Sequence, residues 1–282
     1  MVKVLKDYVE ITRLHRPIGV YLVLWPAYWG LLVAKQVSIQ YLVLFALGAV
    51  VMRSAGCIYN DMVDRKFDGS VTRTMNRPLV RKDDPLPMNK AVLFLGINLL
   101  IGFLILVSLP FSSILIGLIA VPLIFTYPWM KRITYWPQLF LGFTFNFGFL
   151  ISWSTHSSLS GAGLLMYGGA ILWTLGYDTI YGHMDADSDL LIGVKSTSLK
   201  LGAYTHIFLS ICYGFCWVLW ALSGYILGLG FAYVIGMLFV AGLFIWQIAT
   251  LNVQNPTNCL MRFKSNNWVG VIIILSILVA RL

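Results

Sequence analysis

The sequence predicts an all-α integral membrane protein, with residues 1–282 forming a single domain of about nine transmembrane helices. Of the 282 residues, 59% are hydrophobic and only 11% are charged, whereas about 25% of a soluble domain is charged. A chain of this length has too little polar sequence to cover so much apolar surface in a soluble core. The basic residues, in addition, gather on one side of the expected helices. Together these features indicate a multi-pass membrane protein.

The expected helices follow from the lengths of the apolar segments. About 20 mostly apolar residues are needed to cross the hydrocarbon core of a bilayer. The connections between these segments are short at one end and longer at the other. The segments expected to span the membrane are 17–34, 39–60, 90–108, 111–128, 136–155, 163–181, 203–223, 229–250 and 267–281.

The basic residues predict the orientation of these helices. Lys35 and Arg281 lie on the side of the short connections, and Arg53 lies inside a helix, so 17 of the 20 Lys and Arg residues lie on the other side. The positive-inside rule places that side, with the N-terminus and the long loops, in the cytoplasm. The net charge of +9 then reflects topology and attraction to anionic lipid. We therefore expect the lipid bilayer as a partner and no nucleic acid.

The first 16 residues show neither a secretory signal pattern nor an Arg- and Ser-rich organelle presequence. This favours the inner (plasma) membrane of a bacterium as the location.

Seven of the 11 acidic residues fall in two short clusters, each following the cytoplasmic end of an expected helix. The first cluster contains Asn60, Asp61, Asp64 and Asp68. A spacing of four residues stacks Asn60, Asp64 and Asp68 on one face of a helix. Asp61 points away from that face. The first cluster thus predicts a row of oxygen ligands along one helix.

The second cluster runs from Asp178 through Tyr181 and Asp185 to Asp187 and Asp189. Tyr181, Asp185 and Asp189 repeat the spacing of four, so we expect them to share one helix face as well. Asp187 points off that face. The repeated spacing suggests two halves of similar design.

Acidic side chains four residues apart repel one another and destabilise a helix, and the cost is greater beside a membrane. Two such clusters become favourable when divalent cations lie between them. Carboxylate and amide oxygens suit Mg²⁺, which commonly binds through a few carboxylates and substrate phosphates. The alternative is a solvated acidic loop without metal. Bases that could hold the rest of a diphosphate follow nearby: Arg73, Arg77, Arg81, Lys131 and Arg132.

Arg53 is expected inside the second helix, about two turns from the interface. A charge at that depth is costly unless it is paired or faces a wet cavity, so it indicates a function. It precedes Asn60 by seven residues, about 10 Å along the same helix face. Arg53 could hold the carboxylate of a substrate whose ring points toward the metal; the alternative is a packing arginine bound to backbone carbonyls.

With these residues in view, nearly the whole chain resembles the UbiA superfamily of intramembrane prenyltransferases. The superfamily patterns NDxxDxxxD and DxxYxxxDxxxD match the first and second clusters. Ser188 stands where many relatives carry a further acid. Other strings resemble the branch that uses 4-hydroxybenzoate more than the haem O, menaquinone or chlorophyll branches: 16–19 with 24–26, 64–69, 73–79, 127–132 and 192–197.

This resemblance implies a function and a set of site residues. It implies nine helices around a central cavity whose cytoplasmic mouth carries the two Asp-rich motifs. The expected reaction moves a polyprenyl group from an allylic diphosphate to the ring carbon beside the hydroxyl of 4-hydroxybenzoate, in ubiquinone biosynthesis. Mg²⁺ would be held by Asn60, Asp64, Asp68, Asp185 and Asp189, with Asp61 a further candidate. Arg13, Arg73, Arg77 and Lys131 would bind the diphosphate, and Arg53, Asn60, Asp178 and Tyr181 the aromatic acceptor.

The expected chemistry is ionisation of the allylic C–O bond, followed by attack of the phenol ring on the cation. The metal-binding acids and Asp178 form the expected catalytic set, with Asp178 a candidate to receive the ring proton or orient the acceptor. Two alternatives stay open. One is an enzyme for another acceptor, such as homogentisate or a dihydroxynaphthoate. The other is a divalent-cation or proton transporter, although transporters tend to place such acids near the membrane midplane.

Overall fold

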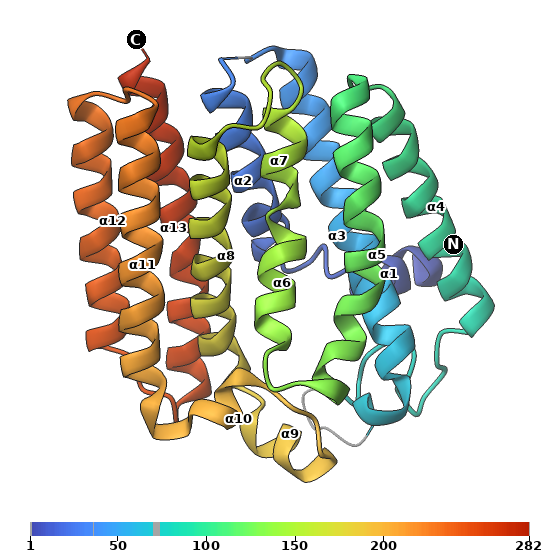
Figure 1. The fold of residues 1–282 in the computed structure, drawn as a ribbon. Helices are drawn as coiled ribbons and strands as arrows, with labels where there is room; N and C mark the ends of the chain where they lie inside the picture. The colour runs from blue at the N-terminus through green and yellow to red at the C-terminus, as the bar shows by residue number, and fades with distance from the viewer. Residues whose placement is uncertain (1, 36, 70–73, 282) are drawn as a thin grey trace.

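The structure, a computed structural model, describes residues 2–35, 37–69 and 74–281, and this part of the chain folds into α-helices and one 3₁₀ turn (Figure 1). Several helices follow a residue whose side chain caps their first turn. The side chain of Ser38 accepts a hydrogen bond from the backbone N–H of Tyr41 at 3.2 Å, and that of Asn255 accepts one from the backbone N–H of Asn258 at 3.1 Å. The elements are α1 (Val2–Ile11), α2 (Ile18–Val33), α3 (Ile39–Asp68), α4 (Met88–Val107), α5 (Phe111–Ile133), α6 (Pro137–Phe145), α7 (Phe147–Trp153), α8 (Gly161–Gly182), α9 (Ala186–Ile192), α10 (Thr197–Leu201), η1 (Gly202–Tyr204), α11 (Thr205–Ile226), α12 (Phe231–Ala249) and α13 (Pro256–Ala280).

Six helical segments of the described chain are long and apolar enough to cross a membrane, which identifies a multi-pass membrane protein. They are α3, α4, α5, α12, α13 and the continuous segment Thr197–Ile226. The three other expected spans correspond to α2, the pair α6–α7 and α8, which fall short in length or hydropathy. The all-helical membrane fold is confirmed, and the number nine stays a prediction.

The expected single span 136–155 is wrong in detail, because Asn146 separates α6 from α7. Its side-chain amide donates to the carbonyl oxygens of Gly142 at 2.7 Å and Ala170 at 3.1 Å, and to the hydroxyl of Thr174 at 2.8 Å. Two of these bonds lead to α8. A fully buried amide requires such partners, and here they join α8 at the point where the helix breaks.

The largest core cluster lies where α2, α8 and α11 meet, around Trp29, Trp173 and Trp220. None of the three side chains is exposed, and their ring centroids lie 5.4 to 5.9 Å apart. Each indole N–H also has an acceptor, which for Trp173 is the side-chain oxygen of Asn266 on α13 at 2.8 Å. Such aromatic packing fixes the relative positions of helices that lie far apart in the sequence.

The long connections gather at one end of the molecule. Figure 1 shows α9 and α10 at the bottom, close to the end of α5, while the C-terminus lies at the top. The first helix, α1, belongs to a second core cluster, in which Ile11 packs with Ile58 of α3. Residues 12–17 connect α1 to α2, and we call this segment the N-terminal strap.

Candidate functional site

Two adjoining cavities lie between the helices at the end that carries the long connections. The large cavity has a volume of about 1210 Å³ and the small cavity about 190 Å³. The N-terminal strap, α2, α3, α5, α6 and α8 all line the large cavity. Both cavities share part of their walls, so the small cavity continues the large one; the shared residues are Asn60, Arg77, Tyr127, Pro128, Asp178 and Tyr181.

The first acidic cluster is helical throughout, as expected, because α3 continues without a break to Asp68. Asn60, Asp64 and Asp68 all line the small cavity. A straight α-helix puts residues four apart on one face, and this face is the one turned toward the cavity. The first cluster therefore forms one wall of the small cavity.

The second cluster differs from the expectation of one continuous helix face. The helix α8 ends at Gly182, a turn follows, and Asp185 caps the separate short helix α9. Tyr181 thus belongs to α8, whereas Asp185 and Asp189 lie on α9, where the backbone N–H of Asp189 donates to the carbonyl of Asp185 at 2.8 Å. Both aspartates still line the small cavity, which the first cluster also lines.

Basic side chains already neutralise part of the first cluster. Lys131 forms an ion pair with Asp64, and Arg77 donates to Asp68 at 2.6 Å. Asn60 donates to the same Asp64 oxygen at 3.0 Å, while the other, buried oxygen of Asp64 has no hydrogen-bond partner. The guanidinium of Arg132 lies 4.0 Å from that oxygen, so the oxygen keeps its capacity to accept a hydrogen bond.

Among the described residues, no three Asp, Glu, His or Cys side chains are gathered closely enough to form a metal site by themselves. The lining of the small cavity nevertheless fits a hard divalent cation, because it offers several carboxylates together with the amide oxygen of Asn60.

Asp61 has a different environment from the other members of its cluster. Only 1% of its side chain is exposed, and it is absent from the walls of both cavities. Arg13 donates to both of its oxygens, at 2.6 and 3.1 Å, and Arg77 donates to one of them at 3.1 Å. Burial by itself would lower the pKa of Arg13, but the carboxylate of Asp61 raises it above its ordinary value. Asp61 thus holds two cations that line the cavity.

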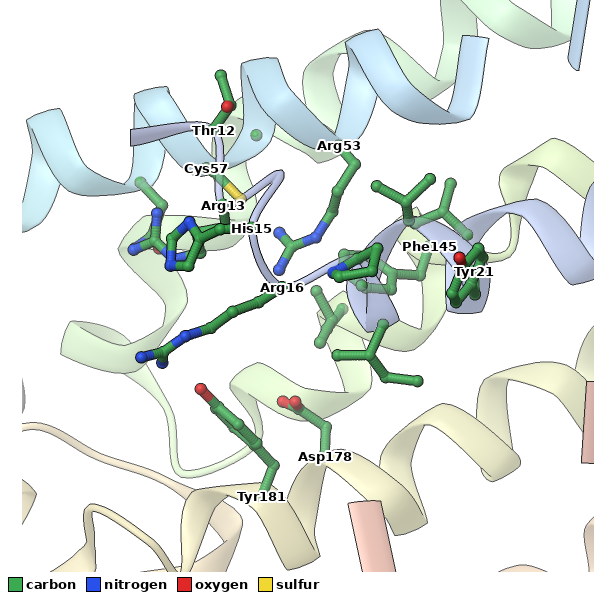
Figure 2. Close-up of a pocket in the computed structure, with 18 of the residues that line it drawn as sticks. Thr12, Arg13, His15, Arg16, Tyr21, Arg53, Cys57, Phe145, Asp178 and Tyr181 are labelled. Atoms are coloured by element: carbon green, nitrogen blue, oxygen red, sulfur yellow. The ribbon is translucent and has the colours of Figure 1, made fainter. Parts of the chain in front are cut away.

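Arg53 and Asp178 enter the large cavity from opposite sides, Arg53 from α3 and Asp178 from α8 (Figure 2). The guanidinium of Arg53 lies 5.2 Å from the ring centroid of Phe145. In the described part of the chain, neither Arg53 nor Asp178 makes a hydrogen bond or an ion pair. An arginine that lines a cavity and forms no ion pair is suited to bind an anionic substrate group.

The structure brings most of the predicted site residues together. Asn60, Asp64, Asp68, Asp178, Tyr181, Asp185 and Asp189 line the small cavity, with Arg77 and Lys131, while Arg13 and Arg53 line the large one. Asp61 lies behind the walls, and Arg73 lies outside the described residues.

Several lining residues carried no predicted role. Arg16 extends from the strap toward Tyr181 in Figure 2, and it belongs to the string 16–19, which indicated the family and no role for Arg16. Gly19 belongs to the same string, whereas Phe145 gave no signal in the sequence. Both contact Arg53 from other helices, and such contacts depend on tertiary packing.

A model of the UbiA prenyltransferase family matches residues 23–270. The chain is 41% identical to the mitochondrial 4-hydroxybenzoate polyprenyltransferase of Drosophila pseudoobscura pseudoobscura, over 98% of this chain and 71% of that protein. It is 40% identical to the 4-hydroxybenzoate octaprenyltransferase of the bacterium Saccharophagus degradans, over 98% of this chain and 92% of that protein.

Solved structures show the same architecture. A UbiA homolog from Aeropyrum pernix K1, in its apo form, matches with a TM-score of 0.80 and 25% identity, over 93% of this chain and 98% of the other. A UbiA homolog from Archaeoglobus fulgidus, solved with GPP and Mg²⁺ bound, matches with a TM-score of 0.67 over 97% of this chain and 99% of the other. At 16% identity, the second likeness concerns the fold alone.

Proposed function

Because the chain belongs to the UbiA prenyltransferase family, we propose that it transfers a polyprenyl group from an allylic diphosphate to 4-hydroxybenzoate in ubiquinone biosynthesis. The new bond forms at the ring carbon ortho to the hydroxyl, and diphosphate is released. The observation that carries the proposal is the arrangement of two acidic walls around one small cavity, which opens into a larger cavity with an unpaired arginine.

The donor's diphosphate is proposed to bind at the small cavity and the adjoining strap. Asn60, Asp64, Asp68, Asp185 and Asp189 would hold Mg²⁺, which when bound would neutralise the negative charge that develops on the leaving diphosphate. Arg13, Arg77 and Lys131 supply the cations for the remaining phosphate oxygens. Arg73 is proposed for the same role from the sequence. The partly unsatisfied Asp64 carboxylate supports this assignment.

The acceptor is proposed to bind beside Arg53 in the large cavity. The guanidinium is suited to the carboxylate of 4-hydroxybenzoate, because a bidentate arginine–carboxylate pair fixes both position and orientation. Asp178 and Tyr181 line the same cavity from α8, and Asn60 lies between the two substrate sites. In this pose the hydroxyl end of the ring points toward the small cavity, where the reactive end of the donor lies.

The reaction then follows from this geometry. The allylic C–O bond breaks and its electron pair leaves with the diphosphate, while cationic side chains stabilise the growing charge. The ring carbon ortho to the hydroxyl bonds to the allylic cation, and a base removes the proton from that carbon. Asp178 is our candidate to accept that proton or to orient the ring.

Water must be kept away from the allylic cation, which would otherwise be captured as a prenyl alcohol. The apolar part of the large cavity can exclude water and hold the polyprenyl tail. Its walls include Val20, Val23, Met52, Ile124, Leu141, Phe145 and Leu260.

The membrane is proposed to be a bacterial inner membrane, with the N-terminus and both acidic clusters on its cytoplasmic side. A bacterial and a mitochondrial relative are about equally similar to this chain, at 40% and 41% identity. Fractionation of the source cells would therefore identify the membrane that contains the protein. Recovery of the protein with mitochondrial membranes would overturn the proposal.

The function is tested by incubating membranes that contain the protein with geranyl diphosphate and labelled 4-hydroxybenzoate, with and without Mg²⁺. We expect a prenylated product only with the metal. Diphosphate hydrolysis without that product would reject the acceptor, and homogentisate and a dihydroxynaphthoate would be tried next. If folded protein gives neither product nor hydrolysis, the enzyme proposal fails, and metal flux into proteoliposomes would test the transporter alternative.

A further inference from the structure

Asp61 belongs to the first acidic cluster by sequence but not by position. Asn60, Asp64 and Asp68 line the small cavity, whereas Asp61 lines neither cavity. One residue along an α-helix corresponds to a rotation of about 100°, which turns Asp61 toward the N-terminal strap. The carboxylate is buried on that side, where it pairs with Arg13, which lines the large cavity.

Asp61 instead joins two segments that are distant in the sequence. Arg13 in the strap donates to both carboxylate oxygens of Asp61, and Arg77, which follows α3, donates to one of them. Bidentate pairing fixes the plane of a guanidinium as well as its distance. Arg77 also uses this same nitrogen to reach Asp68 at 2.6 Å. Asp61 therefore holds Arg13 in a bidentate pair and shares Arg77 with Asp68, and both cations face the cavities.

The backbone at Arg13 supports this interpretation. Its φ angle is 58°, in the left-handed region that non-glycine residues seldom adopt. Such a conformation persists only where surrounding contacts maintain it. The carbonyl of Ile11, at 3.1 Å from the guanidinium, and Asp61 supply those contacts. The strap is thus shaped so that the guanidinium of Arg13 reaches Asp61 while it lines the large cavity.

We infer that Asp61 is a positioning residue and not a metal ligand: it holds Arg13 and Arg77 in the orientation that receives the donor's diphosphate. This inference rests on the proposed function, because it assumes a diphosphate donor. Charge attraction alone would predict that a diphosphate binds more tightly when Asp61 is neutralised, and the inference predicts the reverse. Removing the charge of Asp61 makes the site more positive, yet we expect a diphosphate to bind more weakly, since the two guanidinium groups lose their fixed orientation.

Asp61→Asn is the test variant, and Asp7→Asn is its matched control. Asp7 is also a buried carboxylate, and it ties α1 to the residues that follow α3 by accepting from Arg81 at 2.7 Å. Arg81 was expected among the bases near a diphosphate, but it lines neither of the two cavities, and Asp7 lines neither as well. If Asp61 only tied two segments together, as Asp7 does, the two variants would therefore change diphosphate binding to the same extent.

The measurement is binding of a non-reactive donor analogue, geranyl S-thiolodiphosphate, to the purified protein by titration calorimetry with Mg²⁺ present. We expect Asp61→Asn to weaken binding roughly tenfold, a typical coupling within an ion-pair network, and Asp7→Asn to leave it nearly unchanged. The Mg²⁺ concentration for half-maximal diphosphate release at saturating donor should stay at the wild-type value in Asp61→Asn and rise in Asp64→Asn.

A double-mutant cycle makes the test specific. If Asp61 acts through the two arginines, Asp61→Asn should cost much less in an Arg13→Gln, Arg77→Gln background than in the wild type. Independent losses, or a raised Mg²⁺ requirement in Asp61→Asn, would overturn the inference and return Asp61 to the metal ligands. Wild-type protein that binds the analogue but makes no prenylated product would overturn the acceptor assignment alone, whereas wild-type protein that binds no analogue would overturn both proposals.

Discussion

Replacing Gly19 by alanine should displace the guanidinium of Arg53 and weaken binding of the aromatic acceptor. Gly19 lies in the first turn of α2, against the Arg53 side chain of α3. A Cβ atom added at Gly19 would lie 2.5 Å from Nε of Arg53 and 3.0 Å from Nη2, whereas ordinary contacts begin at 3.4 Å. The guanidinium must therefore move by about 1 Å away from Gly19.

The size of the effect follows from the contact that is lost. A hydrogen bond between charged groups contributes about 1.5–3 kcal/mol, which corresponds to about 10- to 100-fold in affinity. We expect a rise of that size in KM for 4-hydroxybenzoate, with KM for the prenyl diphosphate nearly unchanged. We expect the fold to be kept, because the three atoms nearest to the new Cβ belong to a flexible side chain, and alanine favours a helix more than glycine does.

Gly56→Ala is the matched control. Gly56 lines the same cavity, also from α3, and an added Cβ there meets no atom within 4 Å. Initial rates measured against each substrate in turn, with purified protein in lipid nanodiscs, separate the two KM values. An unchanged acceptor KM in Gly19→Ala, or an equal rise in Gly56→Ala, would refute the assignment of Arg53 to the acceptor carboxylate.

The other predictions concern the metal, the core and pH. Asp64→Ala or Asp185→Ala should remove nearly all turnover while the protein still inserts into the membrane, and substantial residual activity in either variant would contradict a site with two acidic walls. EDTA should abolish prenyl transfer and added Mg²⁺ should restore it, as product formation measures. Trp173→Ala should destabilise the protein by about 3–5 kcal/mol, because the side chain is fully buried, whereas Trp268→Ala, at a residue 60% exposed, should change thermal unfolding in detergent little. Burial, and then the neighbouring His206, lower the pKa of His183 to about 4. The unfolded chain binds this proton already at higher pH, so the free energy of unfolding should fall as the pH drops from about 6.5 to 4. His183→Gln should weaken that pH dependence, which thermal unfolding at several pH values would measure.

The residue spacing predicted the position of the first acidic cluster but not that of the second. Asn60, Asp64 and Asp68 were expected on one helix face, and α3 presents them in that way because a spacing of four residues matches the helical repeat. Tyr181 and Asp185 have the same spacing, but the prediction that they share one helix face is wrong. The chain turns after Gly182, and Asp185 begins a new helix. Spacing predicts a shared face only while the helix continues, and the spacing does not show where the helix ends.

The sequence by itself determined the membrane fold, the gathering of basic residues on one side and the residues of the acidic walls. These properties depend on composition and on local repeats, which are present in the chain before it folds. The tertiary structure alone decided which acid faces the cavity, which acid orients Arg13 and Arg77, and that Gly19 leaves room for Arg53. These contacts join residues that are up to 48 positions apart, so they arise from the packing of helices against one another, and no local pattern in the sequence encodes them.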